Sequence, residues 1–189
     1  ITITPNNDVS YRVTITDSYK CTASDIITIR VSNPTINAGL DKNICIGDSV
    51  TLTGTPSGGF SPLSFLWNPG SNTNSNIKVS PSTTTSYTVV VTDNVGCSNT
   101  DGVNVNVSNP SANITNDTIL CYGNNINLSI NVSGGSPPYH FLCHPGGNTT
   151  STFNVSPLLA IKYNVSFTDS YVCFLEYSVL VKVSNPIVS

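Results

Sequence analysis

The chain has 189 residues, only 9% of them charged, and a formal net charge of −3. Its basic residues are scattered singly, which excludes the basic footprint of a protein that binds nucleic acid or an anionic membrane surface. No apolar run approaches the roughly 18–20 residues that a membrane span needs, so no membrane insertion is predicted for this segment.

The composition predicts an all-β chain. Ser, Thr, Asn and Val dominate, and Glu176 is the single glutamate. Thr and Val favour strands, while Asn, Gly, Pro and Ser favour turns. Six cysteines favour an oxidising, extracytoplasmic location. None of them forms a C-x-x-C pair, so a structural zinc site is not predicted. Residue 1 falls inside a strand-like pattern without a signal sequence, so we expect an internal piece of a longer protein.

One stretch recurs three times at a fixed interval. Its middle copy runs through Thr92-Asp93 and Cys97 into Val107-Ser108-Asn109-Pro110. The cysteines of the three copies are 76 residues apart (97 − 21 = 173 − 97 = 76), which indicates a tandem array. The period divides the chain into the C-terminal hairpin of a truncated repeat (1–33), two complete repeats (34–109 and 110–185) and the start of another (186–189).

Residues 1–33 are predicted to form the hairpin. Val9, Tyr11, Val13 and Ile15 alternate with polar residues, as a strand with one buried face requires. A turn follows at 17–20, and apolar residues alternate again from Ile27 to Val31.

The repeat at 34–109 is predicted to hold about seven short strands. Apolar runs are separated by Gly, Pro, Asn and Ser at spacings of roughly 8–12 residues, which is typical of a β-sandwich. The expected strands include 44–46, 50–52, 63–67, 77–79, 87–91 and 103–107.

The repeat at 110–185 follows the same pattern with one informative substitution. Cys143 stands where the first complete repeat has Trp67. We therefore expect the second core to be filled differently or to be looser, with Cys143 as a buried free thiol. The Ser-Asn-Pro joins at 32–34 and 108–110 are short, and proline restricts them further, so little independent swivelling is expected.

Four separated motifs carry a resemblance to a known family. They are Ile44-Cys45-Ile46-Gly47-Asp48-Ser49-Val50-Thr51-Leu52, Leu66-Trp67-Asn68-Pro69-Gly70, Ser80-Pro81-Ser82-Thr83-Thr84-Thr85-Ser86-Tyr87-Thr88-Val89 and Val91-Thr92-Asp93-Asn94-Val95-Gly96-Cys97. The chain resembles the PKD-like, immunoglobulin-like repeats of giant Bacteroidetes surface adhesins, such as the SprB-type gliding-motility adhesin. It departs from that pattern at Cys143 and at Val172, where the first complete repeat has Gly96.

The resemblance implies tandem seven-stranded immunoglobulin-like (PKD-like) β-sandwiches joined end to end in a secreted bacterial surface protein, exported by the type IX system. The expected function is a non-catalytic stalk or spacer of an adhesin or filament, serving gliding motility or attachment. Its expected partners are neighbouring repeats of the same chain and a surface glycan or protein of unknown identity. The alternatives are a glycan- or protein-binding module and an accessory domain of a larger secreted enzyme. No catalytic residue, cofactor or metal is predicted.

Several side chains are candidates for a binding or catalytic site. His140, Cys143 and His144 could suggest a metal site or a nucleophile, but the first complete repeat has no matching set. The Asp of each Thr-Asp pair can accept hydrogen bonds from turn amides, and one Asp falls short of the six to eight oxygens that calcium needs. Recurrent tyrosines suit core or corner packing. Tyrosines in predicted loops could stack on a sugar: Tyr19, Tyr122, Tyr139 and Tyr171.

Two residues are candidate modification sites. Ser49 and Thr118 lie in Asp-Ser-Val and Asp-Thr-Ile triplets. These triplets resemble the acceptor of Bacteroidetes O-glycosylation.

Two disulfide patterns fit the repeat. The simpler one joins cysteines within a repeat, Cys45–Cys97 and Cys121–Cys173. In an immunoglobulin-like sandwich, however, such partners lie at opposite ends, roughly 25–30 Å apart, and a disulfide needs its Cα atoms within about 7 Å. In a head-to-tail array Cys45 would lie near Cys173, so we prefer that pair. Cys21 and Cys97 would then pair with preceding repeats, and Cys121 with a following one.

Overall fold

The computed structural model describes residues 2–185, and every regular element in that range is a β-strand. The prediction of an all-β chain is therefore confirmed. The expected start of a further repeat, at 186–189, lies outside the described residues. Within residues 2–185 there is no helix with the length and hydropathy of a membrane span.

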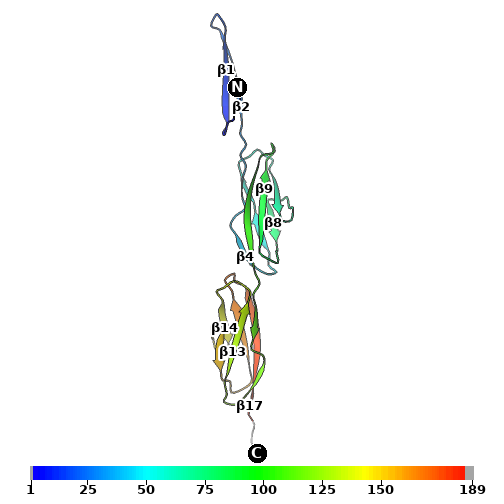
Figure 1. The fold of residues 1–189 in the computed structure, drawn as a ribbon, viewed down its shortest axis with the longest axis vertical. Coiled ribbons are helices and arrows are strands. Elements are labelled where there is room, and N and C mark those ends of the chain that lie inside the picture. The colour runs from blue at the N-terminus through cyan, green and yellow to red at the C-terminus, as the bar shows by residue number, and fades with distance from the viewer. Residues whose placement is uncertain (1, 186–189) are drawn as a thin grey trace, which may run out of the picture. The chain divides into compact units, whose positions relative to one another are not determined.

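The chain divides into two compact units by the proximity of its Cα atoms. Unit 1 holds the described residues up to Gly39, together with Thr53–Ile77 and Tyr87–Gly102. Unit 2 holds Leu40–Leu52, Lys78–Ser86 and the described residues from Val103 onward. Figure 1 colours the chain by residue number and labels some of its strands.

Unit 1 begins with a two-stranded hairpin, drawn in blue in Figure 1. Its strands are β1 (Val9–Thr16) and β2 (Thr22–Ile29), paired antiparallel from Val9↔Ile29 to Thr16↔Thr22. The turn closes with the Lys20 N–H donating to the Asp17 carbonyl at 3.1 Å. Nearly all residues of this hairpin are exposed.

Two further strand pairs lie in unit 1. One joins β3 (Thr35–Asn37) to β6 (Thr55–Ser57), and the other joins β7 (Ser64–Asn68) to β9 (Thr85–Thr92), both antiparallel. Side chains on β9 alternate as the sequence predicts, with Tyr87, Val89 and Val91 buried. Trp67 on β7 lies directly opposite Val89.

The first complete repeat contributes four more strands: β4 (Lys42–Cys45), β5 (Val50–Thr53), β8 (Asn76–Val79) and β10 (Ser98–Ser108). β5 pairs with β8, and one four-stranded sheet has the order β4-β10-β9-β7. β4 runs parallel to β10, which places Cys45 opposite Ser108.

The second complete repeat lies wholly in unit 2 and forms seven strands in two sheets. The strands are β11 (Ser111–Ile114), β12 (Thr118–Cys121), β13 (Ile126–Ser133), β14 (His140–His144), β15 (Thr152–Val155), β16 (Ile161–Thr168) and β17 (Phe174–Ser184). The sheet orders are β11-β13-β15 and β12-β17-β16-β14. Inward-facing apolar residues of both sheets form one buried core, as in a β-sandwich.

The core of the second repeat is filled differently from that of the first, as the Cys143 substitution predicts. Cys143 is 1% exposed, and large side chains surround it in the buried cluster, among them Ile130, Phe153 and Phe167. Gly54 occupies the position of Ile130 in the first repeat, and the strand is interrupted there into β5 and β6.

Candidate functional site: aspartate turns and cysteines at the repeat joins

His140, Cys143 and His144 do not converge on one site. All three lie on β14, whose alternation leaves both histidines exposed and turns Cys143 into the core. Burial raises the pKa of the Cys143 thiol, which disfavours the thiolate that a nucleophile or a metal ligand needs. In the described part of the chain, no three His, Cys, Asp or Glu side chains are grouped so as to hold a metal ion.

The two candidate glycosylation residues lie in different settings. Ser49 is exposed in the turn between β4 and β5. Thr118 is half-buried at the start of β12, where it pairs with Val181 of β17. A modifying enzyme could therefore reach the whole Ser49 side chain, but only part of Thr118.

Cys45 and Cys173 form a disulfide. Their Cα atoms are 5.5 Å apart, their sequence separation is 128, and both residues belong to unit 2. The alternative pairs Cys45–Cys97 and Cys121–Cys173 are not formed, because Cys97 and Cys121 carry free, exposed thiols. The reason is strand length: Cys97 precedes the first residue of β10, whereas Cys45 pairs with its last, roughly ten residues or 33 Å along the strand.

The carboxylate of Asp169 is the centre of a buried hydrogen-bond cluster in unit 2. Its Oδ2 accepts the Ser108 hydroxyl and the Ser136 N–H, the latter at 3.1 Å. Its Oδ1 accepts the N–H groups of Tyr171 and Cys173, each at 2.9 Å. Asp169 is 2% exposed and Ser108 is 3% exposed. A buried carboxylate needs such donors, because an unpaired buried charge is strongly unfavourable.

The same cluster occurs 76 residues earlier, in unit 1. The Asp93 Oδ2 accepts the Ser32 hydroxyl and, at 3.2 Å, the Phe60 N–H. The Asp93 Oδ1 accepts the N–H groups of Val95 at 3.1 Å and Cys97 at 2.8 Å. In both clusters the serine comes from the end of one repeat and the aspartate from the next repeat.

The hairpin carries a third copy of the turn without the serine. Asp17 Oδ1 accepts the N–H groups of Tyr19 and Cys21, both at 2.8 Å, and the residues are exposed. The aspartate therefore organises its own turn locally, as the sequence predicts. In the clusters of Asp93 and Asp169, the serine at the end of the preceding repeat donates an additional hydrogen bond.

Hydrogen bonds hold both buried aspartates in their charged form. Burial raises the pKa of Asp169, but the Ser108 hydroxyl and the N–H groups of Cys173, Ser136 and Tyr171 outweigh it, so the pKa lies below its usual value near 3.8. For Asp93 the Ser32 hydroxyl has the largest influence and lowers the pKa; burial opposes it, and backbone N–H groups assist. Hydrogen bonds to an ionised acceptor are stronger than those between neutral groups.

A pair of consecutive glycines lies close against each Asn-Pro join. A Cβ on Gly134 would lie 2.6 Å from the Asn109 carbonyl oxygen, and one on Gly135 would lie 2.8 Å from the Pro110 Cβ. A Cβ on Gly58, the counterpart of Gly134, would lie 2.5 Å from the Asn33 carbonyl oxygen. Gly134 and Gly58 also have positive φ, at 65° and 68°, so no other residue type fits there without displacing the join.

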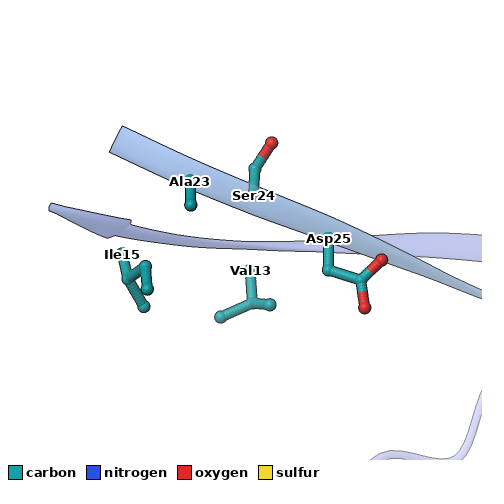
Figure 2. Close-up of a pocket in the computed structure, with 5 residues that line it drawn as sticks. All are labelled: Val13, Ile15, Ala23, Ser24 and Asp25. Atoms are coloured by element: carbon teal, nitrogen blue, oxygen red, sulfur yellow. The ribbon is translucent and has the colours of Figure 1, made fainter. Parts of the chain in front are cut away.

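An apolar face of the β1–β2 hairpin is open to solvent. Val13 is 62% exposed, Ile15 68% and Ile27 65%. Figure 2 shows Val13, Ile15 and Asp25 projecting from one side of the hairpin, with Ser24 on the other. The counterparts of Val13, Ile15 and Ile27 in the next repeat are Val89, Val91 and Val103, which are at most 2% exposed.

The tyrosines do not gather into a sugar-binding platform. Tyr87 and Tyr163 are each 7% exposed and belong to the cores. Tyr139 packs edge-on against Phe167, with ring centroids 5.9 Å apart, and donates its hydroxyl to the Gly134 carbonyl at 2.6 Å. Tyr19 and Tyr122 are exposed but lie on different turns.

Sequence reasoning identified the aspartate turns but missed their serine donors. A signal was present, because Ser32 and Asp93 are 61 residues apart and so are Ser108 and Asp169. A polar pair that recurs at the repeat period, together with the Gly-Gly and Asn-Pro pairs that recur with it, indicates a contact between those segments.

Comparisons with known proteins place the fold. No protein-family model matches the chain, and no curated protein matches it. Titin domains I67–I69 (an E-to-A mutated variant) match with 13% identity and a TM-score of 0.54, over 82% of this chain and 67% of that one. The N-terminal eight immunoglobulin domains of Down Syndrome Cell Adhesion Molecule match with 14% identity and a TM-score of 0.60, over 97% and 32%. Sidekick-1 immunoglobulin domains 1–4 match with 12% identity and a TM-score of 0.51, over 97% and 60%.

The chain thus spans about a third of the second structure and three fifths of the third. At these identities the likeness concerns the fold alone. Together with the sheets described above, it confirms the predicted class: the chain is built of immunoglobulin-like β-sandwich repeats.

Proposed function

We propose that this chain is a non-catalytic spacer segment of a secreted bacterial surface adhesin or filament. Its complete repeats are 34–109 and 110–185, and its partners are the neighbouring repeats of the same chain. The segment separates a distal binding region from the cell and carries tension between them. The immunoglobulin-like fold supports a structural role.

The observation that carries the proposal is the repeated link between the end of one repeat and the next. Ser108 ends β10 and donates to Asp169 of the following repeat, and the Cys45–Cys173 disulfide adds a covalent bond there. Hydrogen bonds to a charged group contribute about 1.5–3 kcal/mol each. Because the Ser-Asp link is also present at Ser32 and Asp93, it belongs to the repeat and not to one special place in the chain.

Residues 1–33 fit the C-terminal hairpin of a further repeat. Their apolar side chains face solvent where the counterparts on β9 and β10 are buried. Asp101 accepts the Ala38 N–H at 2.9 Å, whereas its counterpart Asp25 accepts, among residues 2–185, only the N–H of its neighbour Ile26. The hairpin therefore has the side chains of a sandwich sheet and lacks the strands that cover it.

A chimera tests that assignment. Residues 34–84 placed directly before Val9 restore the spacing of a complete repeat, since Val9 is the counterpart of Thr85. We expect the β1–β2 amides to gain protection from hydrogen exchange, because the added strands cover Val13 and Ile15. The same chimera with Val13→Asp should gain none, and protection in that variant would contradict a sandwich-type core.

An extracellular bacterial location and type IX export complete the proposal. Disulfides persist in oxidising compartments, which supports a place outside the cytoplasm. A role in gliding motility or attachment is proposed from the resemblance of the four sequence motifs. O-glycosylation of Ser49 and Thr118 is proposed from the resemblance of their triplets to the acceptor sequence. Intact-mass measurement of the native protein tests the modification, since an unmodified mass excludes it.

Single-molecule pulling tests the load-bearing role. When the chain is pulled from its two ends, the Cys45–Cys173 disulfide should prevent the residues between these two cysteines from extending. Reduction or Cys45→Ser should lengthen the fully extended chain by about 45 nm, from a separation of 128 residues at about 3.5 Å each. Cys97→Ser is the matched control and should change nothing, because that thiol is free. Specific binding of the isolated segment to glycans on an array would instead favour a binding module.

A further inference from the structure

Cys97 and Cys121 carry exposed free thiols at the positions that correspond, 76 residues away, to the bonded Cys173 and Cys45. We propose that Cys97 and Cys121 are halves of further inter-repeat disulfides of the Cys45–Cys173 type. Cys121 bonds the cysteine at the Cys97 position of a following repeat, and a second copy of repeat 34–109 joined after Asn185 can supply that cysteine in a test. This inference rests on the proposed function and extends it, because every join would then be covalently closed.

Cys121 is held in the same way as Cys45. The parallel pairing of β12 with β17 places Cys121 opposite Ser184, as β4 and β10 place Cys45 opposite Ser108. The Cys121 carbonyl accepts the Asn124 N–H at 3.0 Å, and the Cys45 carbonyl accepts the Asp48 N–H at 3.0 Å. The backbone around the free thiol is therefore already in the geometry of the bonded one.

Cys97 is likewise held as Cys173 is. Its N–H donates to Asp93 Oδ1 at 2.8 Å, and its carbonyl accepts the Asp93 N–H at 2.9 Å. The corresponding distances at Cys173 and Asp169 are 2.9 and 3.2 Å. Neither half needs a rearrangement of its own turn before bonding.

The equivalent serines of the two repeats differ in exposure. Ser108 is 3% exposed because it bonds Asp169, whereas Ser184, its counterpart, is exposed. Cys121 is exposed beside it. Ser184 can thus donate its hydroxyl to the turn aspartate of a following repeat. Cys121 can form a disulfide with the cysteine of that same turn.

The reaction is an oxidation with a defined stoichiometry. The S–H bonds of Cys97 and Cys121 break, one S–S bond forms, and two electrons and two protons leave. Glutathione disulfide accepts them and becomes two molecules of glutathione, by exchange through a mixed disulfide.

A tandem fusion tests the proposal. The full chain through Asn185 is joined directly to residues 34–189 of a second copy, which recreates the natural Asn-Pro join. The fusion is oxidised with glutathione disulfide, free thiols are alkylated, and peptides are mapped without reduction. We expect a disulfide between Cys121 of the first copy and Cys97 of the second. Cys97 of the first copy and Cys121 of the second should be alkylated.

The two Cys45–Cys173 disulfides of the fusion distinguish the possible failures. If both form while Cys121 of the first copy is alkylated, this inference is overturned and the proposed function stands. If neither forms, the proposed covalent joint falls as well. In the control fusion with Cys97→Ser in the second copy only, Cys121 of the first copy must become alkylated. A new partner for Cys121 in that control would show indiscriminate oxidation and overturn the proposal.

Discussion

The two complete repeats fill equivalent cores with different side chains. In the first, Trp67 is fully buried, and Gly54 lies next to its strand partner Val89: a Cβ on Gly54 would lie 3.4 Å from the Val89 side chain. In the second, Cys143 and Ile130 occupy the two positions, at 1% exposure each. The backbone bond beside them is unchanged, since Gly54 donates to Ser75 and Ile130 donates to Ser151, both at 2.8 Å.

The difference teaches that equivalent core positions of this fold can hold residues of very different size, a large one at one position accompanying a small one at the other. Trp67 on β7 goes with Gly54, the residue between β5 and β6, whereas Cys143 on β14 goes with Ile130 on β13. Other exchanges follow the same logic, with Ile77 replaced by Phe153 and Val91 by Phe167.

Breaking the Trp67–Gly54 pairing should have the largest effect. Trp67→Cys should destabilise the first repeat by about 3–5 kcal/mol, because it leaves a cavity. Gly54→Ile alone should cost about 1–3 kcal/mol by overpacking against Val89 and Ile36. The double variant should lose at least about 1 kcal/mol less than the sum of the two. Urea denaturation followed by circular dichroism measures all three, and strict additivity would show that the positions are not coupled.

Removing an aspartate at a join should have the next largest effect. Asp169→Ala leaves the Ser108 hydroxyl and three backbone N–H groups without their acceptor, so unfolding free energy should fall by about 2–4 kcal/mol. Asp17→Ala is the matched comparison in the exposed hairpin and should cost much less. Thermal unfolding of both variants checks this. Equal losses would mean that the local turn, and not the inter-repeat link, carries the stability.

Acid should weaken both joins by a smaller amount, because a protonated aspartate still accepts hydrogen bonds. The folded pKa values of Asp93 and Asp169 lie below the usual value near 3.8. Their contribution is therefore fully present above about pH 4 and is lost as the pH falls through the lowered values. Urea midpoints measured from pH 7 to pH 2 should show this decline, and Asp169→Asn should make it shallower. An unchanged slope in that variant would contradict the assignment.

Exchanging the turn residues should have the smallest effect. Val172 has φ +65° where Gly96 has φ +87°, a backbone region that β-branched residues rarely adopt. Val172→Gly should therefore raise the unfolding free energy by about 1 kcal/mol, after allowing for the greater freedom of glycine in the unfolded chain. Gly96→Val should lower it by a similar amount. A melting-temperature comparison decides the sign, and destabilisation by Val172→Gly would show that the turn is not strained.

The strands and their buried faces could be predicted from the sequence because each depends on local alternation. Tyr87, Val89 and Val91 are buried at the predicted spacing. The interruption at Gly54 and the role of Ile130 could not be predicted, since they depend on which residue faces Trp67 or Cys143 across the core. The Ser-Asp links were missed for the same reason, because their partners are 61 residues apart.

Unequal core filling also bears on how a chain of similar repeats avoids pairing the wrong strands. Neighbouring repeats share their register and their period, so a strand could in principle enter the sandwich of the adjacent repeat, a recurrent failure of repeat proteins. If β7 entered the second sandwich, Trp67 and Ile130 would compete for one space. If β14 entered the first, Cys143 beside Gly54 would leave that space empty. The different cores of adjacent repeats thus disfavour the exchange of strands between them. A variant with identical cores should refold with more strand-exchanged species.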